Sequence, residues 1–452
     1  MSSLVSQDAI AAAVDVTATL LEFSQPADAV LSNYFRNNRQ LGSRERGFVA
    51  DTAYAVLRRK RFLERLCGDK GSPRQLVLAA LLRVQGVSQR QLSETLSAAE
   101  SKWLTEFKAR PEPEFTLAEQ CDFPDWLHDK LIAQYSSAQR AEGDSHPPIL
   151  ERGDGGGSLE DSRGLSSQEW LLKLARSLNQ PAPLDLRVNV IKASRDEVLA
   201  HLRAEKIGAE PCRHAPFGIR LKDKPALSKT DLFLTGKIEV QDEGSQLLGH
   251  LLQPKRGEMV ADFCAGAGGK TLLLGALMRS TGRLYAFDVS ARRLAKLKPR
   301  LARSGLSNVH PVVMASENDI RIKRLAGKFD RVLVDAPCSG LGTLRRNPDL
   351  KWRQTPQSID ELTKKQAAIL ASAARLAKPG GRLVYATCSL LREENEDIVA
   401  AFLSSHDQFQ RLSCKELFEQ QGIALEASED LRLFPHLHGT DGFYAAALER
   451  KK

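Results

Sequence analysis

The sequence predicts an α/β protein whose C-terminal half is a parallel sheet covered by helices on both faces. Three observations support this fold class. From about residue 238 onward, near-continuous apolar stretches alternate with stretches of helical periodicity. Residues 1–137 show helical periodicity alone, and residues 169–232 mix both patterns in shorter runs. The chain of 452 residues is long enough for the three domains that these regions imply.

Helical periodicity is clearest in two stretches of the N-terminal region. Residues 44–66 place apolar side chains on one helix face. Residues 72–84 do the same after Ser72 and Pro73, which together form a helix-start signal. The basic run at 58–61 fits either phosphate contacts or a solvated helix face, and the second interpretation is simpler. We therefore expect an all-helical first domain.

Residues 138–168 interrupt this pattern with glycine, serine, proline and charged residues, which predicts a linker or a mobile insertion. The following residues 169–232 predict a small α/β unit. EWLLKLARSL predicts a helix at its start, and LDLRVNVI and GIRLK predict strands. SRDEVLAHLRAEKI predicts a second helix, capped by Ser194.

The last domain, residues 233–452, contains six stretches typical of buried strands, with helical stretches between most of them. Ligands of such sheets bind beyond the carboxyl ends of the strands, so we expect the functional residues there. The six stretches are EMVADFCA, GRLYAFDV, VHPVVMA, FDRVLVDAP, GRLVYATC and GFYAAAL.

The overall composition limits the class of protein. The net charge of +9 and the pI of about 9.2 indicate an anionic partner such as RNA. No apolar stretch has the length of a membrane span, and the N-terminus lacks the basic region of a secretory signal. We therefore expect a cytoplasmic protein with reduced thiols. The seven cysteines form no CxxC pair, so no metal site is expected.

A glycine-rich loop, residues 262–271 with the sequence DFCAGAGGKT, ends the first strand of the last domain. An NTPase phosphate loop requires G-x-x-x-x-G-K-[ST]. Gly269, Lys270 and Thr271 fit its end, but its first glycine would fall on Cys264. No acidic partner for Mg²⁺ is evident in the sequence. An NTPase therefore stays an alternative that fits only part of the motif.

The same loop fits two other ligands. A dinucleotide loop requires G-x-G-x-x-G, which Gly266 and Gly268 satisfy, but Thr271 occupies the last position. A tight glycine turn also suits S-adenosylmethionine, with Asp288 at the end of the next strand on the ribose hydroxyls. The same acid suits NAD. The loop alone therefore does not decide between these ligands.

Two cysteines follow two later strands, Cys338 in DAPCSG and Cys388 in ATCSL, and Asp335 precedes the first. A lone cysteine at a strand end usually packs in the core. Two such cysteines beside a carboxylate and a ligand-binding loop favour a catalytic role over core packing. A thiolate that adds to C6 of cytosine makes C5 able to accept a methyl group, and a nearby acid stabilises charge in the ring. Cytosine methylation would therefore use this set.

Four stretches resemble the RNA cytosine-5 methyltransferases: DFCAGAGGKT, VDAPCSGLGTLRRNPDLKW, YATCS and GTDGFYAA. LDLRVN, IEVQDEGSQLL and the helical N-terminal region resemble one bacterial branch, the small-subunit ribosomal RNA methyltransferase B (Sun/Fmu) group. The resemblance implies a Rossmann-like S-adenosylmethionine-dependent methyltransferase domain, a small α/β RNA-binding subdomain and an all-α NusB-like domain. It also implies 16S rRNA as the partner, free or in early assembly intermediates.

The resemblance implies a role for each site residue. Cys388 would be the nucleophile, and Cys338 would help to release the product. Asp288 would bind the ribose, and Asp335 would lie near both cofactor and base. The cofactor loop would consist of Cys264, Ala265, Gly266, Ala267, Gly268, Gly269 and Lys270.

Two positions depart from the pattern of this family. The family often has proline where this chain has Ala267, but the neighbouring glycines keep the turn plausible. The family also often has an aspartate near the adenine after the third strand, where this chain has Ser316. A serine still offers a hydrogen bond at that place.

The sequence TLRRNPDLKWR, residues 343–353, follows Cys338 closely. Trp352 fits either stacking on a base or packing in a core. A cytosine must leave its stack to meet a thiol, so we expect an unpaired target. An RNA-binding assembly factor with this fold and a DNA methyltransferase remain alternatives. The residues expected to contact phosphates are Arg345, Arg346, Lys351 and Arg353.

Overall fold

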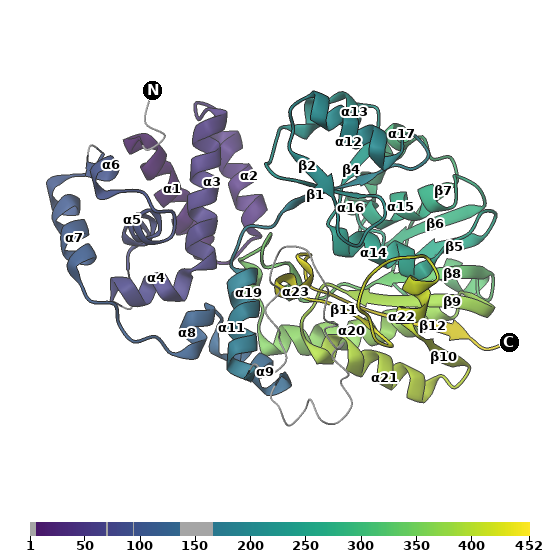
Figure 1. Ribbon diagram of the computed structural model, residues 1–452. Helices are drawn as coiled ribbons and strands as arrows, with labels where there is room; N and C mark the ends of the chain where they lie inside the picture. Colours follow the sequence, from purple (N-terminus) through teal and green to yellow (C-terminus); the bar gives the residue numbers. More distant parts are fainter. Residues whose placement is uncertain (1–5, 69–70, 94, 136–165) are drawn as a thin grey trace, which may run out of the picture. The chain divides into compact units, whose positions relative to one another are not determined.

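The computed structural model describes residues 6–68, 71–93, 95–135 and 166–452 (Figure 1). The chain forms two compact units. The first holds the described residues up to 181 together with Thr343–Pro356, and the second holds Ala182–Gly342 and Gln357–Lys452. The predicted insertion at 138–168 lies outside the described residues, except for its last three positions.

The first unit is helical in its described part, as the sequence predicts. The predicted helix over 44–66 is two helices, because Arg59 departs from helical geometry with φ −112°. The helix α5 begins after Ser72, whose hydroxyl accepts from the Gln75 N–H, as the start signal predicts. The helices are α1 (Gln7–Leu20), α2 (Ala27–Asn37), α3 (Ser43–Arg58), α4 (Lys60–Cys67), α5 (Pro73–Arg83), α6 (Gln89–Ser93), α7 (Ala98–Ala109), α8 (Leu117–Cys121) and α9 (Asp125–Gln134).

Two later segments complete this helical unit. The helix α11 (Ser167–Leu178) is present as predicted, but it belongs here and not to the small α/β unit. Its Trp170 ring lies 4.1 Å from the Tyr135 ring, centroid to centroid. Thr343–Pro356, with the short helix α19 (Leu350–Arg353), also belongs here although it follows the Cys338 loop in the chain. The predicted domain boundaries differ from the structure at both places.

The second unit contains the predicted small α/β region as an antiparallel sheet with the strand order β2-β3-β1-β4. Ser194 caps α12, as predicted. The last strand, β4, lies beyond the predicted limit at residue 232. The elements are β1 (Leu184–Val188), α12 (Arg195–Ala204), β2 (Ala209–Pro211), β3 (Gly218–Leu221), η1 (Leu227–Lys229), α13 (Asp231–Leu234) and β4 (Ile238–Val240).

The large sheet has the order β10-β12-β9-β8-β5-β6-β7, and all six predicted strands are in it. The strands from β9 to β7 are parallel, as predicted, but β12 and β10 pair antiparallel at the other edge. An antiparallel edge on a parallel sheet is a common arrangement. The strands are β5 (Met259–Asp262), β6 (Arg283–Asp288), β7 (Val309–Val313), β8 (Phe329–Asp335), β9 (Ala377–Thr387), β10 (Phe409–Leu412), β11 (Leu431–Leu433) and β12 (Phe443–Arg450).

Helices pack on both faces of this sheet, as predicted (Figure 1). Val260 of β5 packs with α14 and α22, whereas the next residue, Ala261, packs with α20 and α21. This alternation follows from the two-residue period of a strand. The helices are α14 (Glu243–Leu252), α15 (Gly269–Leu277), α16 (Ala291–Ala295), α17 (Leu297–Ser304), α18 (Ile320–Arg324), α20 (Pro356–Ala374), α21 (Glu396–Ser405), α22 (Cys414–Glu419) and α23 (Pro435–His438), with the 3-10 turns η2 (Leu341–Thr343) and η3 (Arg392–Glu394).

Within the described residues, no helix is both long and apolar enough to cross a membrane.

Candidate active site

The two cysteines singled out in the sequence come together at the carboxyl ends of neighbouring strands. Cys338 follows β8 and Cys388 follows β9, and these parallel strands pair in register up to Asp335 and Ala386. The two Sγ atoms lie 3.4 Å apart, and the Cys388 N–H donates to the Cys338 sulfur at 3.3 Å. Both thiols are free and half-buried. The sheet therefore presents two reduced sulfur atoms in contact, open to a partner.

An ion pair lies beside these thiols. Lys270, at the start of α15, donates to Asp335 at 2.7 Å. Burial opposes the charge of Lys270, but the attraction of Asp335 outweighs it and raises the pKa of Lys270 above its usual value. Negative charge on Cys388 raises that pKa further. A fixed positive charge is therefore available to Asp335 and Cys388 together.

The two thiols differ in their surroundings. The hydrogen bond with Cys388, followed by burial, raises the pKa of the Cys338 thiol well above its usual value. Cys338 therefore keeps its proton, and either sulfur can be the donor of the hydrogen bond between them. A thiolate, and not a thiol, is the nucleophile in cysteine chemistry. A protonated Cys338 is therefore a weak nucleophile.

The glycine loop between β5 and α15 has two left-handed positions, Gly266 with φ +57° and Gly268 with φ +82°. At Gly268 a Cβ atom would come within 2.2 Å of Leu297, so only glycine fits there. At Gly266 a Cβ atom would have nothing within 4 Å. The loop therefore packs closely on one side and leaves open space at Gly266, where a ligand can approach the backbone.

Asp288 stands at the end of β6, where the sequence places it, and faces the loop. Its carboxylate accepts from the N–H groups of Gly266 at 2.8 Å and Ser290 at 2.7 Å, and it pairs with Arg293 at 3.0 Å. Ser316 follows β7, and its hydroxyl accepts from the Asn318 N–H at 3.2 Å. Asp288 thus lies against the loop at the position that a ribose-binding carboxylate would need.

Two further loop residues lie beneath the site, Asp262 buried and Cys264 partly buried. Asp262 accepts a hydrogen bond from the Thr271 hydroxyl at 2.7 Å, and its other oxygen has no partner among the described residues. Burial raises the pKa of Asp262 to about 7. Burial and the surrounding carboxylates raise the pKa of the Cys264 thiol. Cys264 packs against the core on one face of the sheet and stays protonated.

Residues of the small antiparallel sheet and of α17 hold the glycine loop in place through hydrogen bonds to its carbonyl groups. Arg187 of β1 donates to the carbonyl of Gly269 at 2.9 Å. Arg300 of α17 donates to the carbonyl of Ala267 at 2.7 Å and pairs with Glu239 of β4 at 3.0 Å. These residues belong partly to LDLRVN and IEVQDEGSQLL, two of the stretches that carry the family resemblance. Their signal in the sequence was a charged residue inside an otherwise buried strand.

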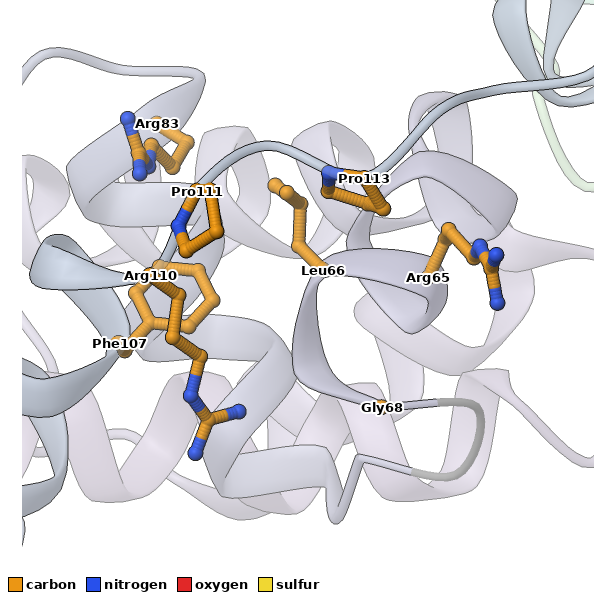
Figure 2. Close-up of a pocket in the computed structure, with 8 residues that line it drawn as sticks. All are labelled: Arg65, Leu66, Gly68, Arg83, Phe107, Arg110, Pro111 and Pro113. Atoms are coloured by element: carbon orange, nitrogen blue, oxygen red, sulfur yellow. The ribbon is translucent and has the colours of Figure 1, made fainter.

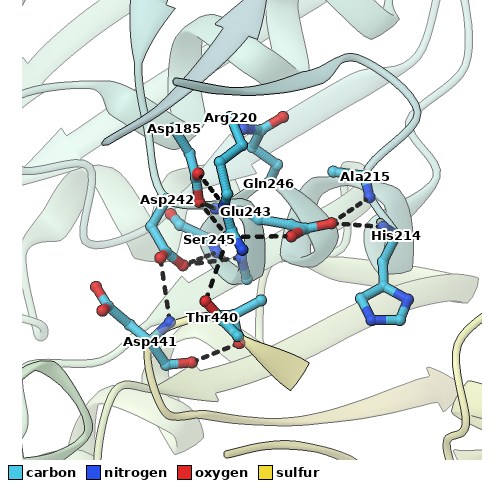
Figure 3. Close-up of polar contacts among 12 residues, drawn as sticks. Asp185, His214, Ala215, Arg220, Asp242, Glu243, Ser245, Gln246, Thr440 and Asp441 are labelled. Atoms are coloured by element: carbon cyan, nitrogen blue, oxygen red, sulfur yellow. Dashed lines mark hydrogen bonds and ion pairs between the residues drawn. The ribbon is translucent and has the colours of Figure 1, made fainter. Parts of the chain in front are cut away.

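A buried acidic cluster ties the same small sheet to α14. One carboxylate oxygen each of Asp185 and Glu243 and the sulfur of Cys212, atoms that could ligate a metal ion, lie within 4.8 Å of one another. Figure 3 shows the Arg220 guanidinium reaching both carboxylates, at 2.8 Å from Asp185 and 3.4 Å from Glu243. Burial raises the pKa of the Cys212 thiol, so it stays protonated. Since Arg220 supplies the positive charge, we interpret this cluster as an ion-pair network.

The loops that carry the thiols pack against a third loop with no side chain between them. The Gly342 N–H donates to the carbonyl of Cys388, and the Gly442 N–H donates to the carbonyl of Gly342, each at 2.8 Å. A Cβ atom on Gly342 would lie 2.2 Å from the Gly442 carbonyl. This close approach explains why GTDGFYAA, far along the chain, contributes to the site.

Glu394 is a site residue that the sequence did not reveal. Its buried carboxylate accepts hydrogen bonds from Ser339 and Ser389, which directly follow the two cysteines. It lies in the acidic run REENED, where nothing distinguishes it from Glu393 or Glu396. Only the fold shows that this acid points inward.

One of the residues expected to contact RNA, Lys351, is buried inside the helical unit. Lys351 is 0% exposed, and its Nζ donates to the Arg58 carbonyl and to Asn179 Oδ1, each at 2.8 Å. Burial lowers the pKa of Lys351 to about 7. The prediction that Lys351 contacts a phosphate is therefore wrong, because its ammonium group is an internal hydrogen-bond donor of the helical unit.

The neighbours of Lys351 share this packing. Arg345 is buried, and its carbonyl accepts from the Arg58 guanidinium at 3.0 Å. The indole N–H of Trp352 donates to the Leu57 carbonyl at 2.9 Å, so this ring packs in the helical unit. Arg346 and Arg353 are half-buried. Their contacts with RNA stay a prediction.

A pocket of about 210 Å³ in the helical unit is lined by none of the predicted site residues (Figure 2). Three arginines frame it, from α4, from the end of α5 and from the residue after α7. Its lining residues are Arg65, Leu66, Gly68, Arg83, Phe107, Arg110, Pro111 and Pro113. None of these lining residues is a nucleophile.

Comparisons with known proteins cover most of this chain. Residues 249–449 match the family described as 16S rRNA methyltransferase RsmB/F, and residues 167–228 match the RsmF/B-like ferredoxin-like domain. The probable ribosomal RNA small subunit methyltransferase B of Bacillus subtilis (strain 168) is 34% identical over 314 residues, which are 68% of this chain and 67% of that protein. The protein of that name from Synechocystis sp. is 34% identical over 343 residues, 75% of this chain and 69% of that one.

Solved structures support the fold over the same range. The crystal structure of PH0851 covers 99% of each chain with a TM-score of 0.73 and 25% identity. That of a methyltransferase homolog protein from Pyrococcus horikoshii has a TM-score of 0.55 and 32% identity, and covers 64% of this chain and 96% of that one. Together with the sheet, the loop and the paired thiols, these likenesses lead to one conclusion: the chain belongs to the 16S rRNA methyltransferase RsmB/F family.

Proposed function

We propose that this protein transfers a methyl group from S-adenosylmethionine to C5 of a cytosine in 16S rRNA. The observation that carries this proposal is the contact of two reduced thiols, 3.4 Å apart, beside the Lys270–Asp335 ion pair. Membership of the family supports small-subunit rRNA as the substrate. The net charge of +9 also suits an RNA partner.

The residues of the glycine loop fit S-adenosylmethionine. The loop from Cys264 to Lys270 would hold it, since open space at Gly266 lets a ligand approach the backbone. Asp288 would bind the ribose hydroxyls, and Ser316 would lie near the adenine. When bound, S-adenosylmethionine supplies an electrophilic methyl group. The remaining chemistry belongs to the side chains of this protein.

Cys388 starts the proposed reaction. Its thiolate adds to C6 of the cytosine and forms a C6–S bond, and the electron pair of the C5–C6 double bond moves into the ring. The Lys270 ammonium stabilises the negative charge that develops in the ring, and its ion pair with Asp335 fixes it in place before the reaction begins. The ring then has a nucleophilic carbon at C5, the position that receives the methyl group.

Release of the product reverses the addition. The proton on C5 is lost to solvent, its electron pair restores the C5–C6 double bond, and the C6–S bond breaks. Cys388 departs as a thiolate. Cys338 would stabilise this leaving group through the hydrogen bond between the two sulfur atoms. Without Cys338 the covalent RNA adduct would therefore persist.

The reaction is tested with radiolabelled S-adenosylmethionine and unmodified 16S rRNA. We expect label in 5-methylcytosine after nuclease digestion with the wild-type protein, and none with Cys388→Ala. Label on another base or atom would overturn the assignment to C5. RNA binding without any transfer would instead favour an assembly factor, and binding of ATP without S-adenosylmethionine would favour an NTPase.

We further propose that the helical unit, which resembles a NusB-like domain, helps to select the RNA. Arg346 and Arg353 remain candidates for phosphate contacts there. The affinity for RNA should then fall steeply as salt is raised, because each phosphate contact releases counterions.

A further inference from the structure

Glu394 places one fully buried carboxylate between the loops that carry the two thiols. It ends the turn η3 after β9, and it is 0% exposed. Its Oε1 accepts from the Ser339 N–H at 2.8 Å, and its Oε2 accepts from the Ser339 hydroxyl at 2.5 Å and from the Ser389 hydroxyl. Ser339 directly follows Cys338, and Ser389 directly follows Cys388. One side chain thus bonds to the neighbour of each thiol.

A fourth donor extends this hold to the other side of Cys338. The Gln366 amide of α20 donates to Glu394 Oε1 at 2.9 Å and to the Pro337 carbonyl at 3.0 Å. The Ser339 and Ser389 hydroxyls also lie 3.0 Å apart. Pro337 and Ser339 flank Cys338, so the backbone on both sides of that thiol is fixed through Glu394.

The turn that carries Glu394 is itself fixed to β9. The Tyr385 hydroxyl donates to the Glu394 carbonyl at 2.7 Å. Asn395 accepts from the Thr387 hydroxyl at 2.5 Å and donates to the Ser389 carbonyl at 3.2 Å. Both Tyr385 and Thr387 belong to β9, the strand that Cys388 directly follows. The carboxylate therefore has little freedom to move relative to either cysteine.

Burial of a carboxylate that only neutral donors hold lowers the stability of the folded state, because the charge loses its hydration. Among the described residues, no lysine or arginine forms an ion pair with Glu394, whose partners are hydroxyl, amide and backbone N–H groups. Apolar packing would fill the same volume at a lower cost. A network of this kind fixes one arrangement of the loops, since every donor must meet the same two oxygens.

We propose that Glu394 is a positioning residue that sets the separation and orientation of Cys338 and Cys388. The catalytic consequence rests on the cytosine methylation proposed above. Glu394 is buried and would not touch the substrate, so it acts only through the two loops. Because a displacement of about 1 Å in a reacting group lowers a rate on the order of 100-fold, loss of this clamp should mainly lower kcat.

The geometric part is tested on the full-length protein without RNA. Dibromobimane links two thiols only when they lie close together and becomes fluorescent when it does so. We expect efficient linkage of Cys338 to Cys388 in the wild-type protein, several-fold less in Glu394→Ala, and an intermediate yield in Glu394→Gln, which keeps the shape and one acceptor. Asp397→Asn, an exposed acid three residues on, is the matched control and should leave the yield unchanged.

The catalytic part is tested by steady-state kinetics of the same variants. We expect kcat to fall on the order of 100-fold in Glu394→Ala, with partial recovery in Glu394→Gln and no change in KM for S-adenosylmethionine. Thermal unfolding and circular dichroism check that each variant is folded. If Glu394→Ala does not fold, Ser389→Ala removes one arm of the clamp and should lower both the linkage yield and kcat.

The outcomes separate this inference from the proposed function. Unchanged linkage and unchanged kcat in a folded Glu394→Ala would overturn the positioning role. A fall in both linkage and kcat with intact cofactor binding would support it. If the wild-type protein methylates no cytosine, the proposed reaction fails, but the linkage result still decides whether Glu394 holds the thiols together.

Discussion

Single residues of the glycine loop show how close the backbone must come to a ligand. Gly266 and Gly257 both have a positive φ and nothing within 4 Å of the place of a Cβ atom, but only Gly266 lies in the predicted cofactor loop. An alanine at either position costs about 1 kcal/mol of strain. The two glycines therefore separate backbone strain from ligand contact.

We predict that Gly266→Ala and Gly257→Ala lower the free energy of unfolding by similar amounts. Only Gly266→Ala should also weaken binding of S-adenosylmethionine, since its methyl group would enter the space left for the ligand. Urea unfolding and isothermal titration calorimetry measure the two effects. Equal cofactor affinity in both variants would show that the ligand does not approach Gly266.

Asp262 gives a second prediction for a single residue. Burial raises its pKa to about 7, whereas the unfolded chain has a value of about 3.9. The folded state thus holds a proton that the unfolded state releases between about pH 4 and pH 7. The free energy of unfolding therefore falls as the pH rises through this window.

Asp262→Asn removes this titration and keeps an oxygen to accept from Thr271. We expect the stability of Asp262→Asn relative to the wild-type protein to increase from about pH 4 to pH 7 and then to stay level. Urea unfolding over that range measures it. Parallel stability curves for the two proteins would show that Asp262 titrates normally.

The sequence predicted which candidate residues meet at the sheet edge better than it predicted the residues that hold them there. Cys338, Cys388 and Asp335 were found because the type of side chain and its place after a strand carry the signal. Glu394 and Arg187 were missed because their roles depend on which way a charged side chain points, and only the tertiary packing decides that.

Among the elements, the segment Thr343–Pro356 departs furthest from its sequence-based interpretation. Its basic residues have the composition of an RNA contact, but the helical unit buries Lys351 and packs Trp352. Composition alone cannot distinguish a lysine that binds RNA from one that is buried. The residue type is the same, and only the tertiary packing decides whether the ammonium group meets internal acceptors. The strands, in contrast, were predicted well because their apolar runs are long and the turns between them are clear.

We predict that Lys351→Met destabilises the protein by about 1–3 kcal/mol, since it leaves the Arg58 carbonyl and Asn179 buried without their donor. It should not change the salt dependence of RNA binding, because the ammonium group does not reach a phosphate. Lys364→Met, at an exposed position of α20, is the control and should leave stability within about 0.5 kcal/mol. A weaker salt dependence in a fully stable Lys351→Met would restore the RNA-contact interpretation.

At the scale of the whole molecule, the helical unit is built from separate parts of the chain. One of these parts, Thr343–Pro356, begins directly after the loop that carries Cys338. Sequence reasoning divided the chain into consecutive domains and therefore could not find this arrangement. The backbone therefore passes directly from the loop that carries Cys338 into the helical unit at Thr343.

Native-state hydrogen exchange tests this organisation in the full-length protein. We predict that the amides of α19 open together with those of α3 and α4, because Lys351 and Trp352 bond to carbonyls at the end of α3. The amides of α20, which follows in the chain but belongs to the other unit, serve as the comparison. If α19 exchanges in step with α20, the division into units is wrong.

The most direct test of covalent catalysis by Cys388 is a denaturing gel of the protein after incubation with 16S rRNA and S-adenosylmethionine. We predict a denaturant-stable protein–RNA adduct with Cys338→Ala, because Cys388 can attack but is not released. We predict no adduct with Cys388→Ala or with the double variant. An adduct that forms only with Cys388→Ala would reverse the roles of the thiols, and the absence of an adduct from every variant would contradict covalent catalysis.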